Sequence, residues 1–119
     1  TRGLAEITRL GLAMGADPLT FAGLAGMGDL ILTTTGALSQ NRALGMALAA
    51  GQTLEDYTAA HRTVAEGVNT AQAALALAEK VGTELPICEQ VAAILFDGKP
   101  ARQAVVDLME RTLKSEQWR

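Results

Sequence analysis

Four consecutive polar residues are the strongest candidates for binding chemistry in this sequence: Ser39, Gln40, Asn41 and Arg42. They stand where a helix is expected to begin, because serine is a preferred N-cap residue. The unpaired backbone N–H groups at a helix start, together with the positive end of the helix dipole, attract anions. Serine and asparagine add neutral donors, and arginine adds a charged fork suited to phosphate. The cluster therefore favours a ligand that carries a phosphate.

One carboxylate, Asp29, precedes this cluster in a glycine-rich apolar stretch. A carboxylate accepts hydrogen bonds from hydroxyls, so the two features together fit a small molecule with a phosphate at one end and hydroxyls at the other. A plainer interpretation stays open on physical grounds. Asp29 and Ser39 can serve as helix caps, and Asn41 and Arg42 can be exposed residues of a first helical turn.

Composition and charge argue against several classes of function. The net charge of the 119 residues is −3, and no basic run is present to neutralise nucleic-acid phosphates. No apolar run approaches the ~20 residues that span a bilayer. The single cysteine, Cys88, fits a reducing compartment and is interpreted as a small residue at the edge of the core. His61 has no second imidazole or thiol at ligand spacing, so we expect no metal site.

The positions of apolar residues, glycines and prolines predict an all-α fold, a compact bundle of about seven short helices in one domain over residues 1–119. Aromatic residues make up only 3% of the chain, so the core must be aliphatic, which suits close helix packing. The expected helices cover residues 2–15, 19–26, 39–50, 53–60, 66–81, 86–98 and 100–112. Residues 27–37 are ambiguous, because the β-branched threonines suit a strand, but a helical turn leading into a loop is preferred.

Helical spacing also predicts which side chains face inward. The expected inward positions are Leu4, Ile7, Gly11, Met14, Ala71, Leu75, Ala78, Val91, Ile94, Leu95, Ala101, Ala104, Val105, Leu108 and Thr112. Asp17 and Pro18 read as an N-cap and first helical residue. Glycines are expected to end the helices that precede them.

Seven sequence blocks stand out along the chain: TRGLAE at residues 1–6, GMGDL at 26–30, TTT at 33–35, SQNR at 39–42 with Gly45 after it, VAEGV at 64–68 with TA at 70–71, ELPI at 84–87 with Glu89, and GKPARQA at 98–104. In this order they resemble the C-terminal domain of bacterial-type NAD(P)-dependent glycerol-3-phosphate dehydrogenases. They cover nearly the whole chain at the separations that the family shows. The combination is far more specific than any single block.

The resemblance implies a helical substrate-binding domain, similar to the C-terminal domain of 6-phosphogluconate dehydrogenase, that closes against an N-terminal Rossmann domain. The implied reaction interconverts dihydroxyacetone phosphate and sn-glycerol 3-phosphate with NAD or NADP, in the cytoplasm, for glycerophospholipid synthesis. By motif, Asp29, Ser39 and Asn41 contact the substrate, and Val64 and Glu66 reach the cofactor. The family arginine that touches both substrate and cofactor corresponds to Gln40 here. A homodimer is also possible for such a domain.

Two departures from the family pattern shape the hypotheses. The family's catalytic lysine lies upstream of the TRG block, where this sequence has no residues, so we expect the chain alone to be inactive. A neutral amide at Gln40 cannot replace a bidentate cation. Losing roughly 1.5–3 kcal/mol of charged hydrogen bonding would weaken phosphate binding by about 10- to 150-fold, unless Arg42 compensates.

Two other functions remain open beside the dehydrogenase domain. One is a stand-alone helical module that binds a phosphorylated metabolite or a protein. The other is a related two-domain oxidoreductase that acts on another small hydroxy compound, which the glutamine at position 40 favours.

Overall fold

Every regular element in residues 1–36, 39–61 and 66–111, which the computed structural model describes, is helical. The all-α prediction is therefore confirmed. The elements are α1 (Arg2–Ala13), α2 (Pro18–Ala22), the π-helical turn η1 (Leu24–Gly28), α3 (Asp29–Thr35), α4 (Gln40–Ala49), α5 (Leu54–Ala60), α6 (Glu66–Val81), α7 (Pro86–Phe96) and α8 (Ala101–Glu110).

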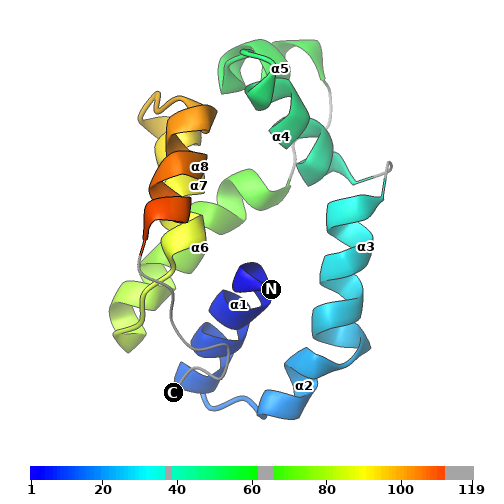
Figure 1. Cartoon of the computed structure of the whole chain (residues 1–119), viewed down its shortest axis with the longest axis vertical. Helices are drawn as coiled ribbons and strands as arrows, with labels where there is room; N and C mark the ends of the chain where they lie inside the picture. Colours follow the sequence, from blue (N-terminus) through cyan, green and yellow to red (C-terminus); the bar gives the residue numbers. More distant parts are fainter. Residues whose placement is uncertain (37–38, 62–65, 112–119) are drawn as a thin grey trace.

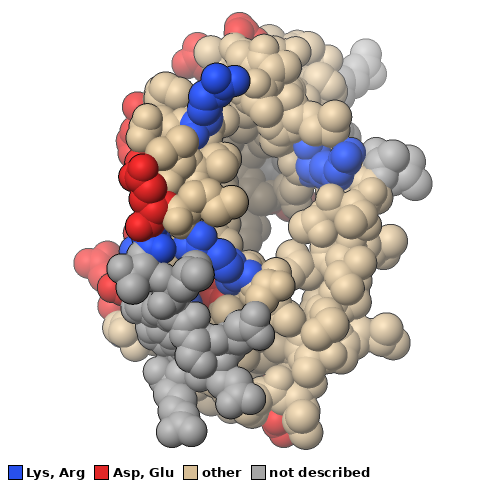
Figure 2. All heavy atoms as spheres, viewed as in Figure 1, with Lys and Arg blue, Asp and Glu red and all other residues tan. Residues whose placement is uncertain are grey.

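Most of the helices form a bundle, and one segment stands apart from it and is joined to it at both ends (Figure 1). Helices α6, α7 and α8 pack in sequence, and α1 contacts α7. Residues 18–35, which we call the arm, comprise α2, η1 and α3; the arm leaves the end of α1 and returns to α4. Helix α4 in turn contacts α5, α6 and α8. The space-filling view shows the molecule hollowed between the arm and the remaining helices, with basic atoms over α4 at the edge of the hollow (Figure 2).

Sequence signals located most helix ends correctly. The glycines that follow α1, α4, α6 and α7 have positive φ angles, a conformation that glycine adopts at no steric cost: Gly15 (90°), Gly51 (99°), Gly82 (73°) and Gly98 (71°). Asp17 caps α2, because its carboxylate accepts the N–H of Leu19 at 2.9 Å, and Pro18 is the first residue of that helix. Pro86 begins α7, as expected.

The arm departs from the sequence prediction. The helix expected over residues 19–26 ends at Ala22 and is followed by the π turn. That turn needs a glycine, because a Cβ at Gly26 would collide with the carbonyl oxygen of Phe21. Residues 29–35 form a complete helix, α3, rather than a turn leading into a loop. The hydroxyls of Thr34 and Thr35 bond to carbonyls four residues earlier, at 2.8 and 2.6 Å, so these β-branched residues fit the helix.

The predicted inward face of α1 is partly wrong. Ile7 and Met14 are 41% and 56% exposed, whereas Glu6 and Arg9 are 5% and 7% exposed. Polar side chains are buried here because their partners lie on the facing segment, as described below. Position 91 was also expected inward but is exposed, since Val91 lines an open pocket.

The described part of the predicted inward face of α8 is confirmed except at Val105, since Ala101 and Leu108 are half-buried. Ala104 is buried as expected, but Val105 is 56% exposed. Adjacent helical positions differ by about 100°, so a contact made through Ala104 turns its neighbour toward solvent. The expected inward residue Thr112 lies outside the described residues.

Glu6 of α1 caps α7 from a distance of 81 residues in the chain. Its Oε1 accepts the backbone N–H of Ile87 at 2.7 Å, and its Oε2 accepts that of Cys88 at 3.0 Å. The residue before α7, Leu85, has no side chain that can cap the helix, and Pro86 has no N–H. A buried carboxylate on the helix start is further stabilised by the helix dipole. Glu6 therefore supplies the cap that the local sequence lacks.

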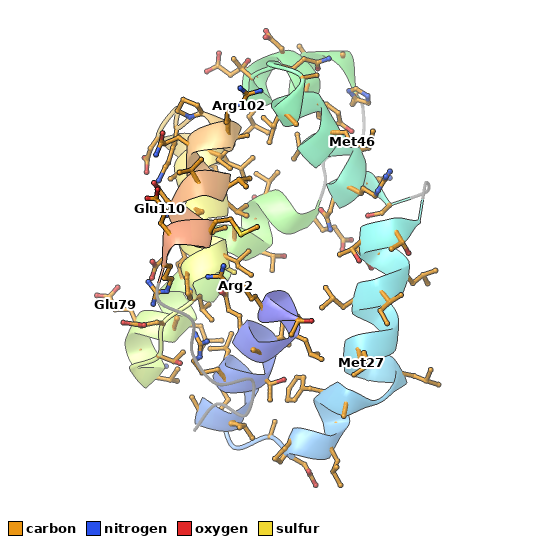
Figure 3. The ribbon with its side chains drawn as sticks, viewed as in Figure 1. Arg2, Met27, Met46, Glu79, Arg102 and Glu110 are labelled. Carbon is orange, nitrogen blue, oxygen red and sulfur yellow. The ribbon has the colours of Figure 1, made fainter. Side chains whose placement is uncertain are left out.

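Arginines of α1 extend this attachment. Arg9 donates through Nη1 to the carbonyl of Glu84 at 2.5 Å, in the connection that leads into α7. Arg2 reaches α8, where its Nη1 donates to the carbonyl of Leu108 at 2.6 Å (Figure 3). Both are charge-assisted hydrogen bonds to backbone oxygens. Together with Glu6 they fix α1 against the α7–α8 pair.

The apolar core joins α4 to α5 and α6 through the buried side chains of Leu44, Tyr57 and Val68. Leu44 lies on α4, two residues after Arg42, the last residue of the polar cluster. Burying side chains of this kind contributes roughly 1.5–3 kcal/mol each. The core therefore holds the start of α4 in a defined position.

Cys88 is half-buried, which agrees with its interpretation as a residue at the edge of the core. Burial, reinforced by the neighbouring Glu6 carboxylate, raises the pKa of the Cys88 thiol from 9.0 to about 12. The start of a helix alone would lower a thiol pKa. Here burial and the Glu6 charge outweigh that effect.

We predict that Glu6→Ala lowers the free energy of unfolding by about 2–3 kcal/mol, because two backbone donors at a partly buried helix start lose their acceptor. Glu6→Gln should cost less, since its amide oxygen still serves one of them. Urea titration of the purified chain measures both. Glu79→Ala, an exposed change near the end of α6, is the control and should stay within about 0.5 kcal/mol. Equal losses for Glu6→Ala and Glu79→Ala would contradict the capping role.

The Cys88 thiol predicts a loss of stability in alkali. In the unfolded chain the thiol ionises above pH 9, whereas in the folded chain it keeps its proton until about pH 12. The contribution of the protonated thiol to the free energy of unfolding is therefore complete below pH 9 and is lost as the pH rises toward 12. Urea titrations at several pH values should show a steeper decline above pH 9 for the wild-type chain than for Cys88→Ala. Parallel declines would contradict the raised pKa.

Candidate functional site

Ser39 begins the candidate site as the N-cap of α4. Its Oγ accepts the backbone N–H of Arg42 at 3.2 Å, which confirms the predicted cap. The hydroxyl proton of Ser39 stays available as a donor. Gln40 is the first residue of the helix and is exposed. The N–H groups of a first helical turn have no partner within the helix, so they add donors at this end.

Asn41 links the start of α4 to the start of α6. Its Oδ1 accepts the backbone N–H of Gly67 at 2.9 Å, although the two residues are 26 positions apart. Gly67 is the second residue of α6, so Asn41 acts on α6 as Glu6 acts on α7. The bond orients the side-chain amide, because its oxygen faces Gly67 and its NH₂ group faces away from that N–H.

Arg42 supplies the positive charge of the cluster. Arg42 is exposed, and its Nη1 lies 3.2 Å from Sδ of Met46, four residues further along α4. A thioether is a weak acceptor, so this contact costs little to break. The guanidinium therefore has the freedom to turn toward an anion at the helix start.

The remaining predicted residues lie at different distances from this cluster. Glu66 is the first residue of α6, next to Gly67, and is exposed. Asp29 is the exposed first residue of α3, and the seven-residue helix, about 10 Å long, separates it from the segment that leads to Ser39. The structure thus brings Glu66 close to the polar cluster and leaves Asp29 at the far end of α3. Val64 lies outside the described residues.

An apolar pocket of about 270 Å³ adjoins Asn41. Residues of α4, α6 and α7 line it, including Leu44, Val68 and Val91. The polar atoms of the cluster therefore stand beside an apolar wall that reduces competition from water.

Donors dominate the chemistry that this site offers. The Ser39 hydroxyl, the Asn41 NH₂ group, the Arg42 guanidinium and the first N–H groups of α4 all present hydrogen atoms. Such a set suits an oxygen-rich anion such as a phosphate ester. Within the described residues, no three His, Cys, Asp or Glu side chains gather in a way that could hold a metal ion. In the same residues, no helix has the length and apolar character needed to cross a membrane.

Gly67 is the residue at this site whose role the sequence did not predict. The VAEGV block contains it, but only Val64 and Glu66 were expected to act there. A glycine directly after the first residue of a helix weakens that helix and so suggests a close contact. Its partner was not predictable, because the contact depends on how α4 packs on α6.

These features define an all-helical protein with a donor-rich helix start whose chemistry suits a small anionic ligand. The family profile described as "NAD-dependent glycerol-3-phosphate dehydrogenase C-terminus" matches residues 1–106. The chain therefore belongs to that family, as its sequence blocks predicted.

Relatives and a solved structure agree with this assignment. The chain is 61% identical over 118 residues, 99% of its length, to a protein of Geobacter sulfurreducens named glycerol-3-phosphate dehydrogenase [NAD(P)+]. It is 60% identical over 116 residues, 98% of its length, to a protein of the same name from Myxococcus xanthus. It spans 35% of each of these relatives. The crystal structure of glycerol-3-phosphate dehydrogenase from Coxiella burnetii superposes with a TM-score of 0.88 and 40% identity, covering 92% of this chain and 34% of that one.

Proposed function

We propose that this chain is the substrate-binding portion of an NAD(P)-dependent glycerol-3-phosphate dehydrogenase. The complete enzyme would interconvert dihydroxyacetone phosphate and sn-glycerol 3-phosphate by hydride transfer. The donor-rich start of α4 carries this proposal, because it lies in a chain whose family and curated relatives have that activity in their names. The chain supplies about a third of such an enzyme, so the dinucleotide-binding portion and the catalytic lysine would come from the rest.

The ligand roles follow the chemistry of the side chains. Ser39, Asn41 and Arg42 donate to the phosphate or to a hydroxyl oxygen of the substrate, and Gln40 stands beside them as a neutral donor and acceptor. Asp29 lies at the far end of α3 from the cluster, and the family resemblance assigns it to a substrate hydroxyl. Hydride transfer needs the substrate held in a fixed orientation, which these contacts provide.

Glu66 is the described residue suited to the cofactor. Its exposed carboxylate at the start of α6 can accept hydrogen bonds from hydroxyl or amide groups, which NAD and NADP both carry. Val64 is proposed to contact the same cofactor through its apolar side chain. The reduced cofactor, NADH or NADPH, would supply the hydride that reduces dihydroxyacetone phosphate, and the oxidised form would accept it in the reverse reaction. A cytoplasmic location, glycerophospholipid synthesis and a homodimer remain predictions of the family resemblance.

A chimeric enzyme tests the proposal. The C-terminal part of the G. sulfurreducens relative that aligns with this chain is replaced by the chain itself, and oxidation of NADH and NADPH with dihydroxyacetone phosphate is measured. We predict turnover, and a KM for dihydroxyacetone phosphate that rises in Asp29→Ala.

We further predict that Gln40→Arg lowers that KM by about tenfold or more, because it adds a charged, bidentate phosphate donor. Gln52→Arg, an equal charge gain at an exposed position after α4, is the control and should change the KM little. Equal effects of the two substitutions would mean that position 40 is not at the phosphate. Turnover of another hydroxy compound in preference to dihydroxyacetone phosphate would favour a related oxidoreductase.

A further inference from the structure

Asn41 can serve a ligand in two opposite ways, depending on how its amide is turned. An amide has an oxygen that accepts hydrogen bonds and an NH₂ group that donates two. In this structure Oδ1 accepts the N–H of Gly67 at 2.9 Å. The backbone N–H is a donor only, so it fixes the choice: the oxygen is held by α6, and the NH₂ group remains for a ligand.

The position of Gly67 makes this contact possible. A Cβ at residue 67 would lie 2.8 Å from Oδ1 of Asn41, which is closer than a Cβ approaches an oxygen, and a tight 3.2 Å from its Cγ. The atoms in the way belong to the end of a side chain, so a methyl group at position 67 would displace the amide of Asn41 rather than the backbone. Glycine at this position therefore affects the orientation of Asn41 more than it affects the fold.

The neighbouring groups present donors too. The Oγ of Ser39 already accepts the N–H of Arg42, so the hydroxyl has its proton left to donate, and Arg42 has no acceptor atom. With the amide of Asn41 turned as observed, the start of α4 presents hydrogen atoms from each of these side chains. With the amide reversed, an oxygen would face the ligand and repel an anion.

We propose that Gly67 is a positioning residue for the ligand site. It holds the amide of Asn41 so that the NH₂ group faces the ligand, and thereby makes the start of α4 selective for an oxygen acceptor of a phosphate ester. The inference rests on the proposed function, since it concerns the same substrate site.

Gly67→Ala in the chimeric enzyme tests the inference. We expect the KM for dihydroxyacetone phosphate to rise by about tenfold or more, as for the loss of a hydrogen bond to a charged group. The KM for NADH and the melting temperature should change little. The matched control is Gly45→Ala, also in a helix, where an added Cβ meets no atom within 4 Å. That variant should keep the KM of the parent chimera.

The double variant separates positioning from a merely structural effect. Asn41→Ala should raise the KM for dihydroxyacetone phosphate, and Gly67→Ala added to it should raise it no further, because residue 67 acts through Asn41. If the two substitutions multiply their effects on the KM in the double variant, the inference is overturned. It is also overturned if Gly67→Ala leaves the KM unchanged while Asn41→Ala raises it. The proposed function would stand in both cases. A chimera that does not reduce dihydroxyacetone phosphate would remove the proposed function and this inference with it.

Discussion

The Glu6 carboxylate, carried by α1 and buried at the start of α7, is the contact on which the arrangement of the other helices depends. It accepts two backbone N–H groups of a helix whose own preceding residues offer no cap. A buried charge is costly unless it is fully hydrogen-bonded, and a bare helix start is costly unless its donors find acceptors. The carboxylate and the two N–H groups satisfy each other's need for a hydrogen-bond partner. The arm follows the C-terminal end of α1, so the position of the arm depends on this contact between α1 and α7.

The same device operates at the candidate site on a smaller scale. Asn41 accepts the N–H of Gly67 and so ties the start of α4 to the start of α6. In both places a side chain from one helix caps another that follows it in the chain. At α7 the result is structural, because Glu6 is buried. At α6 the capping side chain is exposed, and its unused NH₂ group is available for binding. One kind of contact thus stabilises the fold at α7 and, under the proposed function, orients a ligand-binding side chain at α6.

Local chemistry made much of the fold predictable. Asp17 and Ser39 cap the helices that they were expected to cap, and glycines such as Gly82 end helices with positive φ angles. These features depend on neighbours within four residues. The composition of the candidate site was equally accessible, because Ser39 to Arg42 are contiguous and the family blocks name them.

Long-range contacts were not predictable in the same way. Helical spacing assigned Ile7 to the interior, but the buried residues of α1 are Glu6 and Arg9, whose partners lie more than seventy positions away. The lack of a capping side chain at Leu85 and Pro86 indicated that a residue elsewhere in the chain had to supply the acceptor. The local sequence did not identify that residue. Likewise the sequence identified Asn41 but not the direction of its amide, which depends on α6.

The most direct test of this account is a crystal structure of the chimeric enzyme with sn-glycerol 3-phosphate bound. We predict a ligand oxygen at about 3 Å from Nδ2 of Asn41, with Oδ1 of the same residue still on the N–H of Gly67. The donors at the start of α4 should surround the phosphate or a hydroxyl of the ligand. A ligand bound away from α4, or an Asn41 that releases Gly67 and turns its oxygen to the ligand, would contradict the account.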